Sequence, residues 1–287
     1  MKHSFRLVSL IAALCAAPLC AQVKTEVPPV VAGAKPVGVE HIKIHGAALE
    51  GNLEGDAVDR DVFVFLPPSY AKEKRRRYPV VYALHGFFIG AEQWSGEIHV
   101  PQTIEGAFAQ GAREMIVVLP DSKTVHNGSM YSSSVTTGDF ENFIARDVVS
   151  YIDAHYRTLA RRESRGLAGH SMGGYGAIRI GMKRPDVFSA LYVMSACCLT
   201  ANRNPRPQAM ATAEAIRTRE QAEKAAQAPG FGPSTNLAFA AAWSRTRAAF
   251  GRGPTCRRSD SRRSDAPRSP SAAARARARR SGAPRTL

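Results

Sequence analysis

GLAGHSMGGYGAIRIGMKRPDVFSALYVMSA, residues 166–196, is the stretch of sequence that decides the fold. It begins with four small or apolar residues at 166–169, which predict a strand buried inside a sheet. A helix is predicted from Met172 to about Lys183, because Pro185 cannot continue it. A further apolar run at 191–194 predicts the next strand. Strand, helix and strand in this order favour two parallel strands of one sheet.

The turn between the first strand and the helix carries the pattern G-x-S-x-G at 169–173. Such a turn lifts the hydroxyl of its serine, here Ser171, above the carboxyl end of the strand. The residues two positions away on either side must be small, because larger side chains would collide with the strand and the helix. Gly169 and Gly173 meet that requirement. The pattern therefore predicts Ser171 as a nucleophile.

The alternation of strands and helices continues on the N-terminal side. PVVYAL at 79–84 and MIVVL at 115–119 are short apolar runs, typical of strands buried on both faces. A helix is predicted from Phe140 onward, with Asp139 placed to cap its start. The apolar residues on one face of that helix are Phe143, Ile144, Val148, Tyr151 and Ile152. This order predicts a three-layer α/β sandwich with a mostly parallel sheet.

Two weaker patterns flank this central region. Residues 41–49 and 59–66 alternate in polarity and predict two antiparallel edge strands. Beyond them, an Ala-rich segment at 207–228 and a short segment at 237–243 predict two helices. The second helix would be capped by Ser234 or Thr235. The two helices are either a lid over the C-terminal edge of the sheet or simple packing elements.

The end of the sheet is expected to be incomplete. No convincing strand follows Met194, whereas a sheet of this kind needs further strands to cover its edge. We therefore expect the C-terminal strands to be missing, which would leave an exposed sheet edge and apolar surface.

The N-terminus has the pattern of a secretory signal. Lys2, His3 and Arg6 precede an apolar run at 7–19, and Ala21 offers a small residue for cleavage. The run is too short to cross a bilayer as a helix. We interpret 1–21 as a signal peptide, so the protein is expected to be secreted or periplasmic, with no membrane association after cleavage.

Composition divides the rest of the chain into three parts. Residues 22–39 are rich in Pro, Val and Gly and predict an extended leader, and 40–244 form the α/β domain. Residues 245–287 contain thirteen Arg, two Asp and no Lys, so they carry +11 of the net charge of +15. The predicted domain is consequently close to neutral, and the overall charge does not indicate nucleic-acid binding.

The Arg-rich segment at 245–287 uses only ten residue types and begins abruptly after Ser244. Arg, Ala, Pro and Gly have GC-rich codons, so GC-rich DNA read in the wrong frame yields this set. We hypothesise a frameshift near codon 245 that replaced the final strands. The competing interpretation is a disordered Arg-rich arm that binds nucleic acid or an acidic surface. An exported protein has little access to nucleic acid, which disfavours the second interpretation.

A serine nucleophile of this type needs donors for the negative charge that develops on the substrate oxygen. One donor is predicted to be the backbone N–H of Met172, at the N-terminus of the helix. The second is predicted to be the N–H of Phe87, in the loop after the buried strand at 79–84. We interpret His85 as a structural residue that holds this loop by a side-chain hydrogen bond.

The nucleophile also needs a histidine base and an acid that orients it, and in α/β-hydrolases both follow the serine in the chain. None of the eight histidines follows Ser171. His170 is adjacent to Ser171, where successive side chains diverge, so it is badly placed as the base.

Three cysteines remain after signal removal: Cys197, Cys198 and Cys256. An odd number in an exported chain argues against a disulfide framework. We interpret the adjacent pair Cys197 and Cys198 as small buried hydrophobic residues; a vicinal disulfide is the alternative.

Three stretches resemble the putative-esterase family of α/β-hydrolases, which includes S-formylglutathione hydrolases, feruloyl and acetyl-xylan esterase modules, enterochelin esterases and secreted mycolyltransferases. They are YPVVYALHGFFIGAEQW (78–94), GDFENFIARDVVSYIDAHY (138–156) and the stretch at 166–196. The resemblance covers about half of the chain. It implies an α/β-hydrolase fold and a serine esterase that hydrolyses a carboxylic ester, with no metal or cofactor.

The resemblance also implies residue roles and a substrate class. Ser171 would form the acyl-enzyme, and Met172 and Phe87 would form the oxyanion hole. Three residues fall in segments that border the substrate cleft: Trp94, His126 and Tyr131. The expected substrate is a small-molecule or carbohydrate-linked ester. Without the triad histidine we expect little or no turnover, which leaves a non-catalytic binding protein or an acyltransferase as alternatives.

Overall fold

The computed structural model describes residues 25–199, 217–227 and 232–244. The chain divides into two units, 1–251 and 252–287, and the second unit lies wholly outside the described residues. The predicted signal peptide at 1–21 and Arg-rich segment at 245–287 also lie outside them, as does half of the helix predicted at 207–228; its described half contains a helix at Arg219–Gln227. In the part of the chain that the structure describes, no helix is long and apolar enough to cross a membrane.

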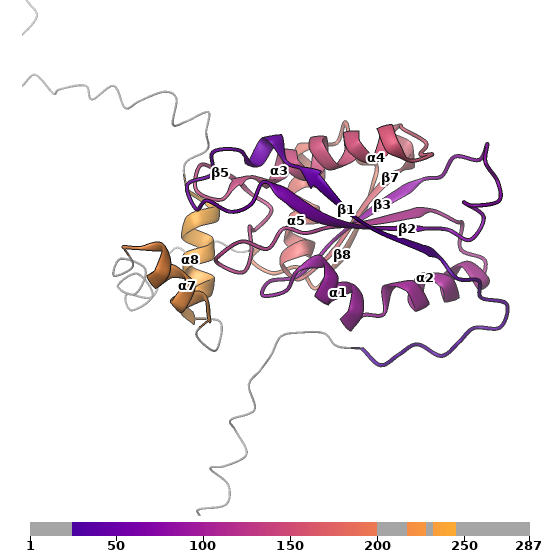
Figure 1. The fold of residues 1–287 in the computed structure, drawn as a ribbon, viewed down its shortest axis with the longest axis horizontal. Coiled ribbons are helices and arrows are strands. Elements are labelled where there is room, and N and C mark those ends of the chain that lie inside the picture. Colours follow the sequence, from indigo (N-terminus) through magenta and orange to yellow (C-terminus); the bar gives the residue numbers. More distant parts are fainter. Residues whose placement is uncertain (1–24, 200–216, 228–231, 245–287) are drawn as a thin grey trace, which may run out of the picture. The chain divides into compact units, whose positions relative to one another are not determined.

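A six-stranded sheet forms the centre of the fold, in the order β1-β2-β4-β3-β7-β8 (Figure 1). The strands are β1 (Gly38–His45), β2 (Asp59–Leu66), β3 (Val80–Leu84), β4 (Ile116–Pro120), β7 (Arg165–His170) and β8 (Ala190–Met194). β4, β3, β7 and β8 run parallel to one another, and β1 and β2 are antiparallel to their neighbours. The mostly parallel sheet is therefore confirmed, and β2, β3, β4, β7 and β8 lie within one residue of the predicted runs. β1 begins and ends earlier than the predicted run at 41–49.

Helices cover both faces of this sheet. The helices of the described chain are α1 (Ala91–Glu97), α2 (Val100–Ala109), α3 (Phe140–Asn142), α4 (Val149–His155), α5 (Met172–Lys183), α7 (Arg219–Gln227) and α8 (Gly232–Ala242). Of these, α7 and α8 pack against each other, and α8 also packs against β5, rather than over a face of the sheet. A π-helical segment, η2 (Phe143–Val148), joins α3 to α4. The minor elements are η1 (Ala47–Leu49), η3 (Arg162–Ser164) and a small hairpin of β5 (Ser133–Ser134) and β6 (Gly138–Asp139). Figure 1 shows α1 and α2 on one side of the sheet and α4 on the other, which makes three layers.

Alternation along β2 explains how both faces are filled. Val62 and Val64 point into the larger core, which the sheet forms with α4 and α5. Phe63 and Phe65 point to the opposite face and pack in a smaller core beneath α1 and α2. Successive side chains of a strand point to opposite sides, so the continuous apolar run at 62–66 needs cover on both faces. β2 is therefore an interior strand, between β1 and β4, and its prediction as an edge strand was wrong.

β8 forms the opposite edge of the sheet. Within the described ranges it pairs with β7 only, and three of its apolar side chains are exposed: Leu191 by 45%, Tyr192 by 68% and Val193 by 37%. An edge strand with exposed apolar residues and no charged side chain favours self-association. Whether further strands follow β8, as the expected loss of the C-terminal strands implies they do not, lies outside the described residues.

The structure tests the helix caps that were predicted at Asp139 and at Ser234 or Thr235. The Asp139 side chain accepts a hydrogen bond from the N–H of Asn142 at 3.0 Å, which confirms it as the cap of α3. The helix predicted at 237–243 begins earlier, at Gly232, so Ser234 and Thr235 lie inside α8 and the prediction that they cap it was wrong.

The cysteine interpretation also has to be corrected. Cys197 and Cys198 are joined in a disulfide and are only half-buried, rather than forming two buried thiols. Their position after β8, at the rim of the sheet, accounts for the exposure.

Candidate active site

The G-x-S-x-G turn, in which Ser171 is the predicted nucleophile, lies between β7 and α5. Ser171 has φ 54° and ψ −113°, a left-handed conformation that a non-glycine residue adopts only when its surroundings hold it, at a cost of about 1–3 kcal/mol. The holding contacts are backbone hydrogen bonds. Its N–H donates to Met194 O at 3.0 Å, and its carbonyl accepts from Tyr175 N at 3.0 Å and Cys197 N at 3.1 Å.

The two glycines of the turn have no room for a side chain. A Cβ at Gly173 would collide with the carbonyl group of Leu84 and would lie 2.8 Å from His85 O. A Cβ at Gly169 would collide with the carbonyl group of Gly173 and would lie 2.9 Å from Gly174 N. Backbone atoms cannot rotate away as a side chain can. The G-x-S-x-G spacing therefore follows from the close approach of α5 to β3.

The loop after β3 lies directly against Ser171. A Cβ built on Gly86 would be 3.7 Å from Ser171 Cβ, so glycine allows the loop to approach the nucleophile. Phe87 follows Gly86 in this loop. A Cβ built on Gly128 would lie 2.5 Å from the Phe87 ring and 2.5 Å from the Met172 sulfur, so both side chains pack against Gly128. The structure thus places Met172 and the loop that carries Phe87 close to Ser171, and the oxyanion hole that they were expected to form stays a prediction.

His85 holds this loop in place. Its Nε2 accepts a hydrogen bond from Ser122 N at 2.8 Å, so the proton resides on Nδ1, which donates to Gly86 O at 2.8 Å. The imidazole is fully buried, and burial lowers its pKa, which keeps the ring neutral. The structural role predicted for His85 is confirmed.

Tyr131 lies behind the loop, on the far side of His85. It is completely buried, and its hydroxyl donates to His85 O at 3.1 Å. Burial raises the pKa of this hydroxyl well above its usual value. The ring fills the space above Gly176, where a Cβ would be only 2.5 Å away. Tyr131 supports the loop and α5 from within.

The other two predicted cleft residues are placed differently. Trp94 is 3% exposed and packs in the smaller core beneath α1, whereas Met172 and Phe87 belong to the larger core. The structure does not bring Trp94 together with Ser171. His126 is 7% exposed, and its Nε2 lies 3.1 Å from Glu54 Oε1.

His126 belongs to a buried acidic cluster that sequence reasoning missed. Glu54 has a side chain that is only 5% exposed, and Asp56 lies beside it. Burial, followed by the hydrogen bond with Glu54, raises the pKa of Asp56 to about 6. The Asp56 carboxyl also accepts from Val125 N at 3.2 Å. The cluster joins two loops distant in sequence, so no local pattern could have revealed it. It does not constitute a metal site: no group of three His, Cys, Asp or Glu in the described ranges could hold one.

We expect Asp56→Asn to change how stability depends on pH. The pKa of Asp56 is about 6 in the folded protein and about 3.8 when unfolded, so the unfolded chain loses its proton first. The wild type should therefore lose stability as the pH rises from about 4 to 6, and no further above that. The variant lacks this titration and should be about 1–2 kcal/mol more stable than wild type at pH 8, and equal at pH 4. Urea unfolding at both pH values measures this.

The control for that experiment is Glu163→Gln, which removes an exposed carboxylate. It should follow the wild-type pH profile. A loss of stability in Asp56→Asn at pH 8 would show that the folded protein favours the charged carboxylate, which contradicts the raised pKa.

No histidine partner for the nucleophile is found. Among the described residues, no hydrogen bond joins Ser171 Oγ to an imidazole. His170 is half-buried, and burial lowers its pKa, but its Nδ1 faces the Gly86 position. The site therefore has a nucleophile turn and an adjacent loop suited to an oxyanion, without a base in contact with the serine.

Comparison with known proteins gives matches that agree with this geometry. Residues 57–269 match the family model described as "Putative esterase", and the match continues past Arg245. A solved ferulic acid esterase is 31% identical, with a TM-score of 0.50, over 56% of this chain and 61% of that one.

Two curated relatives match the central part of the chain. An endo-1,4-beta-xylanase/feruloyl esterase of Xylanibacter ruminicola is 30% identical over 131 residues, 44% of this chain and 18% of the relative. An esterase of Mycobacterium tuberculosis is 32% identical over 125 residues, 42% of this chain and 26% of the relative. The chain thus matches only about a fifth to a quarter of the length of these relatives. With the family match covering well over half of its residues and the nucleophile turn in place, the chain belongs to the putative esterase family, whose fold is that of the α/β-hydrolases.

Proposed function

We propose that this protein is a carboxylic ester hydrolase that acts through an acyl-enzyme on Ser171. The observation that supports this best is the left-handed conformation of Ser171 at the start of α5, with Gly86 against it. In the reaction, Ser171 Oγ attacks the ester carbonyl carbon, the alcohol leaves, and water then releases the acid and regenerates the serine.

The oxyanion would be held by two backbone N–H groups. Met172 N–H lies at the N-terminus of α5, where the helix dipole favours negative charge. Phe87 N–H comes from the loop that His85 and Tyr131 support from behind. Both groups are part of a rigid backbone, so little reorganisation is needed when charge develops.

The names of the relatives suggest the class of substrate. Two of them carry the name feruloyl or ferulic acid esterase. We propose an ester of an aromatic or other small acyl group, carried by a small alcohol or a carbohydrate. The predicted signal peptide is consistent with action outside the cytoplasm, where such esters of carbohydrate polymers are found.

Turnover by this chain should be slow. No histidine follows Ser171 in the sequence, and loss of the base removes most of the rate while binding and the oxyanion hole retain a remnant. The same feature favours a second candidate, a binding protein that uses the hydrolase cleft without catalysis.

We also propose that residues 245–287 are read in the wrong frame. Their restricted composition supports this, whereas the family match, which extends to residue 269, does not. Sequencing of this locus in several isolates tests the idea. A strand followed by Asp and then His in another frame supports it, and an unchanged frame through Leu287 in every isolate overturns it.

The test of the enzymatic function supplies the missing base from solution. Imidazole at high concentration should accelerate p-nitrophenyl acetate hydrolysis by the wild-type protein more than by Ser171→Ala, because only the former has a hydroxyl to activate. Ser189→Ala is the matched control, since Ser189 is exposed at the start of β8, and it should behave as wild type. Equal imidazole-dependent rates in wild type and Ser171→Ala would overturn the esterase proposal and favour the binding protein.

A further inference from the structure

The proposed reaction leaves the Cys197–Cys198 disulfide without a role. Adjacent cysteines that pair close a small ring through the peptide bond between them. The ring restricts the backbone angles of both residues. Its effect on the site therefore depends on what the backbone at 197–198 contacts.

Backbone hydrogen bonds connect the disulfide segment, residues 195–198, to the nucleophile turn. Ser171 N donates to Met194 O at 3.0 Å, immediately before the segment. Cys197 N donates to Ser171 O at 3.1 Å, inside the segment. These two bonds follow directly on the last pair of the β7–β8 ladder, His170 with Met194. Both the N–H and the carbonyl of Ser171 are therefore hydrogen-bonded to this short part of the chain.

Packing brings the same segment against the first turn of α5. A Cβ on Gly174 would lie 2.9 Å from Met194 O and 3.0 Å from Ala196 Cα. Any outward movement of the disulfide segment would therefore release both the hydrogen bonds of Ser171 and the support of the helix start.

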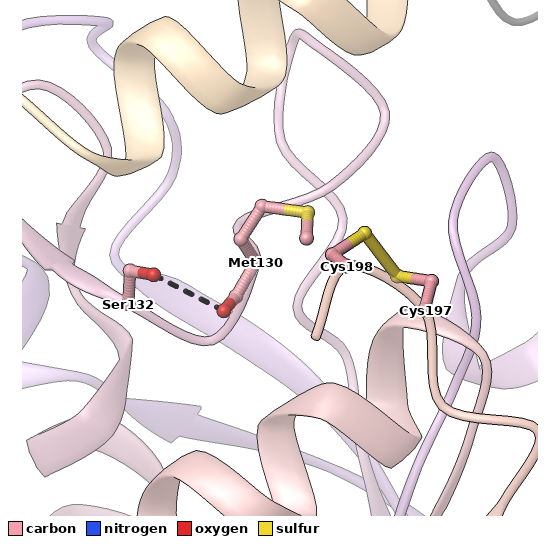
Figure 2. Close-up of a disulfide and its surroundings, with 4 residues drawn as sticks. All are labelled: Met130, Ser132, Cys197 and Cys198. Atoms are coloured by element: carbon pink, nitrogen blue, oxygen red, sulfur yellow. Dashed lines mark hydrogen bonds between the residues drawn. A yellow bond between two sulfur atoms is a disulfide. The ribbon is translucent and has the colours of Figure 1, made fainter. Parts of the chain in front are cut away.

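The backbone of the segment needs to be held. Ser195 has φ 44° and Cys198 has φ 64°, both in the left-handed region that non-glycine residues avoid. The disulfide ring fixes Cys198 in that region. Figure 2 shows the Met130 side chain extending toward Cys198, and Met130 is itself buried. The ring is thus supported from the loop that also carries Tyr131.

The two cysteines are partly exposed to solvent. Both cysteines are half-buried at the edge of the larger core, whereas residues such as Met172 and Ala177 in the same core are fully buried. A small thiol reagent could reach the disulfide without unfolding of the domain.

We propose that the Cys197–Cys198 disulfide is a redox-sensitive positioning element that holds Ser171 in its attacking conformation. A dithiol reductant transfers two electrons and two protons to it, yielding two cysteine thiols and the disulfide of the reductant. The ring then opens, and the left-handed turn at Cys198 loses its constraint. The hydrogen bonds that hold the Ser171 backbone weaken as a result. The effect on catalysis rests on the proposed esterase function, whereas the effect on the turn does not.

The test compares oxidised and dithiothreitol-reduced full-length protein by two independent measurements. Amide hydrogen exchange in the peptide that contains 169–174 should become about tenfold faster after reduction, and exchange in β3 should not change. The imidazole-dependent acylation rate should fall about tenfold, with the substrate concentration at half-maximal rate unchanged. Reoxidation should restore both. The double variant Cys197→Ser/Cys198→Ser should match the reduced form and be insensitive to dithiothreitol, and Cys256→Ser should match wild type.

The outcomes separate this proposal from the esterase proposal. Two free thiols at Cys197 and Cys198 in protein isolated without reductant would overturn the inference, as would equal exchange at 169–174 in the two redox forms. Faster exchange without any Ser171-dependent acylation would support the positioning role while the esterase proposal failed. If the double variant does not fold, the reduction of wild-type protein alone decides.

Discussion

Gly173→Ala is expected to destabilise the protein by about 3–5 kcal/mol, or to prevent folding altogether. The added Cβ would collide with the carbonyl group of Leu84 and would approach His85 O to 2.8 Å. These are backbone atoms of β3 and of the loop that carries Phe87. To make room, α5 would have to move away from the sheet, and the turn at Ser171 would move with it. Urea unfolding followed by circular dichroism measures the change.

The matched control for this substitution is Gly96→Ala in α1. A Cβ at Gly96 would meet no atom within 4 Å. Alanine is a better helix former than glycine, so this variant should be unchanged or stabilised by up to about 1 kcal/mol. A Gly173→Ala protein with wild-type stability would show that α5 does not approach β3 as closely as described.

Asp121→Ala is expected to lower the free energy of unfolding by about 3–5 kcal/mol. Asp121 follows β4, and its carboxylate pairs with the guanidinium of Arg60, which is 8% exposed on β2. The same carboxylate accepts from Ala91 N at 2.9 Å, at the start of α1. Removal of the carboxylate leaves a buried cation without its counter-charge and an N–H without its acceptor.

The control for this substitution is Asp59→Ala, which removes one partner of an exposed pair. Asp59 lies 2.8 Å from His45, and the two side chains are 62% and 54% exposed. Exposed pairs contribute little, so the stability should change by less than about 1 kcal/mol. Thermal unfolding of both variants at pH 7 provides the comparison. Equal effects of the two substitutions would show that Arg60 finds other partners or remains solvated.

The sequence predicted the centre of the fold well because its strands are locally unambiguous. The runs at 79–84 and 115–119 are apolar throughout, and such runs are compatible only with burial on both faces. The turn at Ser171 could be predicted because its glycines are required by a close approach that has no alternative solution. His85 was interpretable for a similar reason, since it lies between a buried strand and a turn.

The failures concern properties that depend on contacts between distant residues. The interior position of β2 depends on its pairing with β4, which is distant in the sequence. A tryptophan in the sequence can line a cleft or fill a core. Only the packing of α1 against the sheet shows that Trp94 lies in the core. The pairing of Glu54 with His126 joins residues from separate loops. The disulfide of Cys197 with Cys198 depends on a backbone turn that composition does not reveal.

The central claim is that Ser171 is the nucleophile, and covalent trapping tests it most directly. The protein is incubated with a fluorophosphonate in the presence of imidazole, digested with trypsin and analysed by mass spectrometry. We expect one phosphonyl group per chain, on Ser171 in the peptide 166–179, and none on this peptide in Ser171→Ala or in unfolded protein. A label on another serine, or no label on the folded protein after prolonged incubation, would contradict the account.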